Sequence, residues 1–426
     1  MLRQYYSSYW KESFRSFLYI FNRELRNVFK DEGVVLFFII VPIFYPILYS
    51  LIYNTETIRE VPVAVVDMSR TALSRDYLRR VDGTPDVNIV AYCANMEEAR
   101  EMIRRREAYG IVCVPKEFTD DLSKGQQTRV SLFIDMSGLL YYKAVLVANT
   151  NVSLELNAQI KVERAGNTTD EQDKVTIYPI SYEEVNLYNP QGGMASFLIP
   201  AVLILILQQT LVLGVGLLAG TARETNRLHE LIPVEKSHHG LLRIVFGKST
   251  LYLLIYIVQS IIALGVIPRI FGLPQIGNPL TLAFFLAPFL LAITFFAMTI
   301  SALIQERENV ILIIVFASIP LLFLSGVSWP AVAMPEWLKY FSYLFPSTFG
   351  VNGFVHINTM GADLLEVRRE WDALWLQSAF YFLTCCLTFR YKIIRARKRT
   401  YKEHLKKRAR QRARQRTYNQ LPTQNS

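Results

Sequence analysis

The sequence predicts a polytopic α-helical membrane protein with six spans and an inserted extracytoplasmic α/β domain. Of the 426 residues, 51% are hydrophobic and 19% are charged, whereas average soluble chains carry roughly 25% charged residues. Apolar runs long enough to cross a bilayer recur along the chain, and a long polar segment with strand-like runs separates the first from the second. This composition excludes a disordered chain, collagen and a small disulfide-stabilised protein.

The predicted spans follow from length, because about 20 apolar residues in a helix cross the hydrocarbon. The first span covers 33–53 and contains no charged residue. The second to sixth lie within residues 194–389, near 194–220, 249–267, 280–304, 310–327 and 371–389. None of the six has an ionisable residue in its interior, which argues against a proton- or sodium-coupled carrier.

Lysine and arginine set the expected orientation. With the N-terminus in the cytoplasm, the segments on that side carry 26 basic residues and the two short outer loops carry 4. Cytoplasmic loops are the basic ones in membrane proteins. Both termini are therefore expected in the cytoplasm, and residues 54–193 outside it.

Residues 54–193 alternate between strand-like and helix-like runs. Strands are expected at 61–67, 87–93, 109–115 and 129–135. A helix is expected after Ser69 as its N-cap, another starts near Asn95, and a long one covers 141–164. Alternation of this kind predicts a parallel sheet built from βαβ units.

Four residues of this domain are candidates for chemistry. Asp67 and Asp135 fall at carboxyl ends of strands, where open α/β sheets bind ligands, but turn and cap chemistry is the favoured interpretation. Cys93 and Cys113 are expected in adjacent strands, and two buried thiols are favoured over a disulfide. No Cys/His spacing suggests a metal site. With no nucleophile–base–acid pattern in the chain, we predict no catalytic residue and no cofactor bound by it.

Residues 1–32 are predicted to form an amphipathic helix in the cytoplasmic interface. Phe14, Phe17 and Phe21 follow the spacing of one helix face. Arg23 and Arg26 lie on other faces. An ordinary core helix is the alternative, and the interfacial interpretation is favoured.

Residues 390–426 form a basic tail with 14 Lys and Arg residues. Binding to anionic lipid is the favoured interpretation, since each basic residue near such a surface contributes about 1 kcal/mol. A solvated tail that only determines topology is the second. Nucleic-acid binding is disfavoured, because neither a suitable fold nor interleaved aromatic residues accompany the charge.

Polar residues in and between the spans have two further interpretations. Gln208 and Gln209 could line a substrate path or bond across helices, and the second is slightly favoured. The segment 221–248, called the coupling loop below, could dock a cytoplasmic partner. Its Gly247-Lys248-Ser249 is not a phosphate-binding loop, because six residues separate Gly240 from Gly247 where that motif has four, and no strand precedes it.

Several short motifs occur in a characteristic order. Arg223-Glu224, Leu231 with Pro233, and Gly247-Lys248 follow one another in the coupling loop. After the fifth span come Leu324-Ser325-Gly326 and then prolines 330, 335 and 346. With residues 61–75 opening the outer domain, the chain resembles the permease subunits of ABC type 2 exporters that carry a large extracytoplasmic domain between the first two spans. Thr225-Asn226-Arg227 replaces the more usual Gly-Thr after the Arg-Glu pair.

The resemblance implies an ATP-driven export permease without an ATPase of its own. A separate cytoplasmic ABC ATPase, which holds ATP and Mg²⁺, would bind the interfacial helix and the coupling loop. The residues implied at this contact are Arg223, Glu224, Leu231, Pro233, Gly247 and Lys248. A second permease copy or a paralogue would complete the core in a bacterial inner membrane, with a periplasmic adaptor and an outer-membrane channel as further partners.

The substrate implied is apolar or amphipathic, and its identity stays open. Two rival functions carry no ATP coupling. One is a membrane-anchored extracytoplasmic binding or adaptor protein, for which one span would suffice. The other is a channel.

Overall fold

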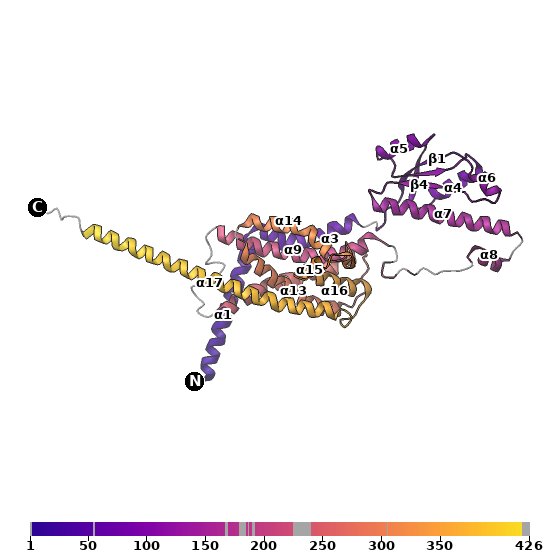
Figure 1. Cartoon of the computed structure of the whole chain (residues 1–426). Helices are drawn as coiled ribbons and strands as arrows, with labels where there is room; N and C mark the ends of the chain where they lie inside the picture. Colours follow the sequence, from indigo (N-terminus) through magenta and orange to yellow (C-terminus); the bar gives the residue numbers. More distant parts are fainter. Residues whose placement is uncertain are drawn as a thin grey trace. The chain divides into compact units, whose positions relative to one another are not determined.

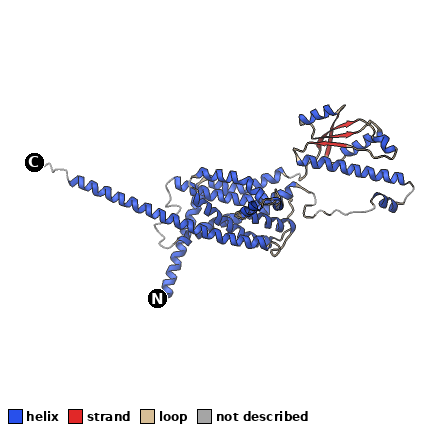
Figure 2. Cartoon of the chain, viewed as in Figure 1, coloured by secondary structure: helices blue, strands red, loops and turns tan. Residues whose placement is uncertain are grey.

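The computed structural model describes residues 2–53, 56–166, 169–178, 185, 187–189, 192–224, 240–304 and 306–419, with side chains described from residue 13 to residue 394 of these. The chain forms two compact units. We call Met1–Asn54 with Gly193–Ser426 the helical unit, and Thr55–Gly192 the sheet unit. Figure 1 labels their elements, and Figure 2 shows that the strands belong to one unit only.

The helical unit begins with α1 (Leu2–Lys30) and a continuous helical stretch formed by α2 (Glu32–Val35), the π-helical η1 (Leu36–Ile40) and α3 (Val41–Ile52). Its remaining elements follow the sheet unit in the chain. They are α9 (Met194–Glu224), α11 (Leu241–Ser260), the π-helical η2 (Ile261–Val266), α12 (Ile267–Ile270), α13 (Pro279–Leu303), α14 (Arg307–Leu324), η3 (Ala331–Ala333), α15 (Glu336–Ser342), α16 (Pro346–Met360) and α17 (Arg368–Asn419).

Within the described residues, five helical stretches are long and apolar enough to cross a membrane. They are Glu32–Ile52, Met194–Glu224, Leu241–Ile270, Pro279–Leu303 and Arg307–Leu324. They coincide with the first five predicted spans, which confirms a polytopic membrane protein. The sixth predicted segment, 371–389, lies in α17 and is not among the five. It contains Asp372 and Gln377, which lower its mean hydropathy.

The core of the helical unit forms around α9. Nearly all of this helix is buried, and it packs against α13, α14, α16 and α3. Its sequence is rich in Leu, Ile and Val on every side, which is typical of a helix in the core of a protein or in a membrane. α14, by contrast, exposes large apolar side chains such as Phe316 and Ile319.

The sheet unit contains a four-stranded sheet in the order β2-β1-β3-β4. Its strands are β1 (Val61–Asp67), β2 (Val87–Tyr92), β3 (Gly110–Val114) and β4 (Ser131–Ile134). Its helices are α4 (Ala72–Asp82), α5 (Met96–Arg104), α6 (Phe118–Ser123), α7 (Leu139–Ala165) and α8 (Asp170–Ile177). One apolar cluster joins the sheet to α4 and α7, and a second joins the opposite face to α5.

The strand directions correct one expectation. β1 is parallel to β2 and β3, but β4 pairs with β3 in the antiparallel sense. A parallel pair needs a crossover that returns the chain along the whole strand. The only helix between β3 and β4 is α6, with 6 residues and a length of about 9 Å. It is too short for that return, so the chain enters β4 in the opposite direction.

Both candidate aspartates hold turns. Asp67 Oδ1 accepts hydrogen bonds from the N–H groups of Ser69 and Arg70, both at 3.0 Å. Asp135 Oδ1 accepts one from the Ser137 N–H at 2.9 Å. The turn interpretation is confirmed. The N-cap of α4 is Thr71 rather than the predicted Ser69.

The four cysteines of the chain are free. Cys93 follows β2 and Cys113 lies in β3, so β1 separates them and the expectation of adjacent strands was wrong. Both side chains are buried, and burial raises the pKa of each thiol. The prediction of two buried thiols is confirmed.

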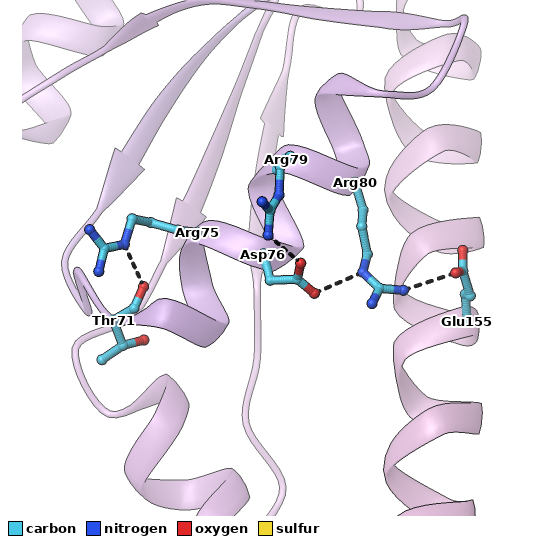
Figure 3. Close-up of polar contacts among 6 residues, drawn as sticks. All are labelled: Thr71, Arg75, Asp76, Arg79, Arg80 and Glu155. Carbon is cyan, nitrogen blue, oxygen red and sulfur yellow. Dashed lines mark hydrogen bonds and ion pairs between the residues drawn. The ribbon is translucent and has the colours of Figure 1, made fainter.

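Ion pairs lie on the surface of the sheet unit, on α4 and between α4 and α7 (Figure 3). Asp76 accepts from Arg79 at 2.7 Å and from Arg80 at 2.8 Å. Arg80 also reaches Glu155 on α7 at 2.9 Å. The two pairs of Asp76 lie within α4, and only the pair of Arg80 with Glu155 joins α4 to α7, which the apolar cluster already packs together.

Candidate functional site

The first helix lies against α11 through a narrow buried stripe. Ile20, Glu24 and Val28 on α1 are buried, and they recur every four residues along one helix face. Phe14, on the predicted apolar face, is 62% exposed, while Phe17 and Phe21 are only partly buried. Because Ile20 and Glu24 lie outside the predicted stripe, the buried face is rotated from it.

A glycine on α11 permits this close contact. A Cβ atom at Gly247 would lie 2.8 Å from Ile20 Cγ2, closer than two carbon atoms can approach without repulsion. Any larger residue at this position would push α1 away from α11. Gly247 therefore has a packing role in the structure.

Lys248, the next residue, makes a buried ion pair with α1. Its Nζ lies 2.7 Å from Glu24 Oε2, and the side chains of Lys248 and Glu24 are only 4% and 3% exposed. The Tyr252 hydroxyl, one turn further along α11, donates to the other oxygen of Glu24. Three groups from two segments thus satisfy one another away from solvent.

α11 begins at Leu241, eight residues before the predicted third span, 249–267. Lys248 therefore lies inside the helix and directly before that span, as the last residue of the coupling loop. Sequence reasoning did not identify Glu24. The signal available was its place between Ile20 and Val28, since a carboxylate four residues from an apolar residue on either side lies on an apolar helix face.

A second junction joins the start of α2 to α9 and α14. Arg307 Nη2 lies 3.0 Å from Asp31 Oδ1, with the two side chains 35% and 12% exposed. Thr221, at the end of α9, donates to Asp31 Oδ2 at 2.9 Å. Asp31 also accepts from the Gly33 N–H at 3.1 Å and so caps α2.

The Arg-Glu pair at the end of α9 serves two helix termini. Glu224 Oε1 accepts the Arg307 backbone N–H at the start of α14, at 2.8 Å. Arg223 Nη2 donates to the Ser301 and Ala302 carbonyls at the end of α13, at 2.9 and 3.2 Å. A carboxylate at a helix N-terminus and a cation at a C-terminus both complement the helix dipole. The two side chains therefore tie α9 to α13 and α14.

A comparison with known protein families covers these helices and the sheet unit. Residues 33–387 match the pattern of the family described as ABC-2 family transporter protein. The chain belongs to the ABC-2 transporter family. The match contains the whole sheet unit and, apart from Glu32, the five candidate spans of the described residues.

Three relatives illustrate the range of the family. The chain is 21% identical over 356 residues to the probable multidrug ABC transporter permease YbhR of Escherichia coli strain K12, covering 84% of this chain and 92% of the relative. It is 22% identical over 367 residues to the linearmycin resistance permease protein LnrN of Bacillus subtilis strain 168, covering 81% and 91%. It is 21% identical over 364 residues to ABC transporter G family member 20 of Dictyostelium discoideum, covering 82% and 47%.

The remaining predicted site residues of this ABC-2 protein lie at different places in the chain and differ in burial. Leu231 and Pro233 lie outside the described residues. Gln208 bonds across helices as favoured, since its Nε2 donates to Ser347 Oγ at 3.0 Å and its Oε1 accepts the Ser347 N–H at 2.7 Å. Gln209 is partly exposed. Arg23 is partly buried and Arg26 exposed on α1.

Metal binding has no support in the part of the chain that the structure describes. No group of three or more His, Cys, Asp or Glu residues there could hold an ion. The site consists instead of polar contacts between helices next to the two ends of the coupling loop. These contacts involve α1, α2, α9, α11, α13 and α14.

Proposed function

We propose that this chain is the membrane-spanning permease subunit of an ATP-driven exporter, moving an apolar or amphipathic substrate outward while a separate cytoplasmic ABC ATPase hydrolyses ATP. Membership of the ABC-2 family supports a permease. The names of two relatives, a probable multidrug permease and a linearmycin resistance permease, support a drug-like substrate. ATP and Mg²⁺ would be held by the ATPase.

The observation that carries the proposal is the anchoring of both ends of the coupling loop. Arg223 and Glu224 tie its start to α13 and α14. Gly247 and Lys248 tie its end to α1. A displacement of this loop or of α1 would therefore pass directly to α9, α11, α13 and α14. A partner that closes on ATP needs such a connection in order to act on the membrane helices.

The proposed topology places the coupling loop and both termini in the cytoplasm and the sheet unit outside, in a bacterial inner membrane. The excess of basic residues in the cytoplasmic segments supports it. Residues 371–389 of α17 would be the sixth span. Its packing along α13 and the burial of Leu374, Cys385 and Phe389 support this.

Further partners complete the proposal. A second copy or a paralogue would form the other half of the core, and anionic lipid would bind the basic tail 390–426. A periplasmic adaptor and an outer-membrane channel would receive the substrate. The rival function of a membrane-anchored binding protein is disfavoured by five candidate spans, since one would suffice. The rival of a channel is disfavoured by the family match.

Purification with and without the ATPase tests the proposal. We expect ATP hydrolysis and transport in proteoliposomes only when both subunits are present. Glu224→Lys combined with Pro233→Gly should lower substrate-stimulated hydrolysis several-fold without loss of membrane insertion. Glu155→Lys, a charge reversal in the sheet unit, is the matched control and should leave stimulation unchanged.

Three outcomes would overturn the assignment. The first is ATP hydrolysis or transport by the isolated chain. The second is unchanged stimulation in the Glu224/Pro233 variant, which would remove the loop from the coupling role. The third is topology mapping that places the sheet unit on the same side of the membrane as the tail.

A further inference from the structure

The sheet unit contains a cleft that its packing leaves open. The cleft has a volume of about 270 Å³ and lies between α7 and the residues of α4, α6 and β4. Residues between 149 and 160 on α7 form one wall. Phe118, Val130 and Leu132 contribute apolar surface opposite it. Arg164, one turn beyond the cleft on α7, donates to the Leu122 carbonyl at 2.6 Å and links its two rims.

The wall formed by α7 is polar in a regular pattern. Asn149, Ser153 and Asn157 line the cleft and recur every four residues, which places them on one face of the helix. The Tyr77 hydroxyl lies 3.3 Å from Asn149 Oδ1 and 3.2 Å from Ser153 Oγ. The buried Tyr77 hydroxyl thus holds the Asn149 and Ser153 side chains in position.

One hydroxyl in the lining has no partner. Thr128 Oγ1 is buried, and no hydrogen bond to it is found among the described residues. The protein covers this oxygen atom, so a ligand in the cleft reaches it only when the Thr128 side chain rotates toward the cleft. A ligand acceptor would then remove the cost of a buried polar atom left unpaired. None of the described residues that line the cleft carries a charge, and a charged ligand would enter it without an ionic partner.

We propose that this cleft binds an uncharged amphipathic small molecule. Its apolar body would lie against Phe118, Val130 and Leu132, while hydrogen-bonding groups would face Thr128 and the row of Asn149 and Ser153. The volume of about 270 Å³ lies just below the range of about 300–1,000 Å³ that is usual for ligand pockets, so a small ligand is expected. That this molecule is the exported substrate rests on the proposed function, whereas the binding site itself does not.

Titration with Nile red, an uncharged amphipathic dye with a carbonyl acceptor, tests the site. The full-length chain in nanodiscs is titrated, and the signal of empty nanodiscs is subtracted. We expect one saturable site per chain. Ser153→Phe, which fills the cleft, should weaken binding at least tenfold. Asn151→Phe, on an exposed face of the same helix, is the matched control and should bind as the unchanged chain does.

Thr128→Val separates ligand binding from structural damage. The substitution removes the unpaired hydroxyl and keeps the side-chain shape, so thermal stability should stay equal or rise while affinity for Nile red falls several-fold. A merely structural role would not lower affinity in a more stable protein. Equal binding by the Ser153→Phe and Asn151→Phe variants would overturn the proposal. So would the absence of a saturable signal, as expected if nanodisc lipid occupied the cleft.

The same samples, combined with the ATPase, keep the two proposals apart. Loss of Nile red-stimulated hydrolysis in Ser153→Phe, with the basal rate retained, would support the cleft as a site for the exported substrate. Saturable binding without any stimulation in the unchanged chain would support the site and contradict its link to the export function. Absence of binding together with intact stimulation would contradict the site alone.

Discussion

The helical unit and the sheet unit each contain an ion pair with the same separation in very different surroundings. Lys248 and Glu24 lie 2.7 Å apart with side chains 4% and 3% exposed. Arg79 and Asp76 also lie 2.7 Å apart, but their side chains are 77% and 30% exposed. Water screens the second pair and not the first. Burial, rather than distance, should therefore determine how much each pair matters to the fold.

The two units use charge for different purposes. The sheet unit is held by apolar clusters on both faces of its sheet, so its exposed pairs only reinforce helices that already pack. In the helical unit, lipid is as apolar as the helix surfaces and gives helices little reason to associate. Paired polar groups at helix ends then specify which helices meet. We expect the effect of breaking a pair to fall as its exposure rises.

The largest effect is expected at the buried pair. Glu24→Ala leaves the Lys248 ammonium buried without its partner, which should destabilise the helical unit by about 3–5 kcal/mol. The drop should appear as a lower midpoint of thermal unfolding of the full chain in detergent, followed by size-exclusion chromatography. A midpoint equal to that of the unchanged chain would show that water reaches Lys248.

A double variant checks that the loss comes from an uncompensated charge. Glu24→Met with Lys248→Met replaces the pair by apolar side chains, and such replacements are often neutral or stabilising. The double variant should therefore recover most of the stability that the single variant loses. Recovery should fail if α1 needs the ion pair itself to find its position on α11.

An intermediate effect is expected at the second junction. Arg307 and Asp31 are 35% and 12% exposed, between the other two pairs. Arg307→Met removes the guanidinium bonds to Asp31 and Thr221 but keeps the helix-capping bonds of Asp31, so about 1.5–3 kcal/mol should be lost. The same unfolding assay measures it. A loss larger than that of Glu24→Ala would break the proposed order.

Sequence reasoning predicted local features of the helical unit better than its contacts. Five spans follow from apolar runs alone, because each run reports its own length and composition. The pairing of Glu24 with Lys248 joins positions 224 residues apart, and no local pattern specifies which helices meet. The lysine lies just before the predicted third span, and the start of α11 at Leu241 was not predicted, so sequence reasoning did not place this charge in a packed helix.

The sheet unit shows the same division. Its strands were placed correctly from β-branched runs, and the start of α5 was placed near Asn95 or Met96, of which Asn95 is the N-cap. The direction of β4 was wrong, because it depends on how far α6 carries the chain and not on the composition of the strand. The cleft beside α7 was not foreseen, since Thr128 and Ser153 come together only in the folded chain.

The smallest effect is expected at the exposed pair, and it depends on pH. Hydrogen bonds from Arg79 and then Arg80 hold the pKa of Asp76 below its ordinary value, so the folded state favours the ionised carboxylate. The stability that this adds is fully present above the unfolded pKa of about 4 and is lost as pH falls through the lower, folded value.

Asp76→Asn removes this contribution, which for an exposed pair should be below about 1 kcal/mol at pH 7. Amide hydrogen exchange in α4 of the full chain, compared between the variant and the unchanged protein at the same pH, measures it. The difference should shrink below pH 4. It should also shrink in 1 M salt, because the Debye length falls to about 3 Å, close to the 2.7 Å separation of this exposed pair. Glu155→Gln, which removes only the charge of the outer partner of Arg80, should change exchange less still. A difference in exchange that grew on acidification would mean that the pKa of Asp76 is shifted in the opposite direction. A loss of stability as large as that in Glu24→Ala would mean that exposure does not determine the order of these pairs.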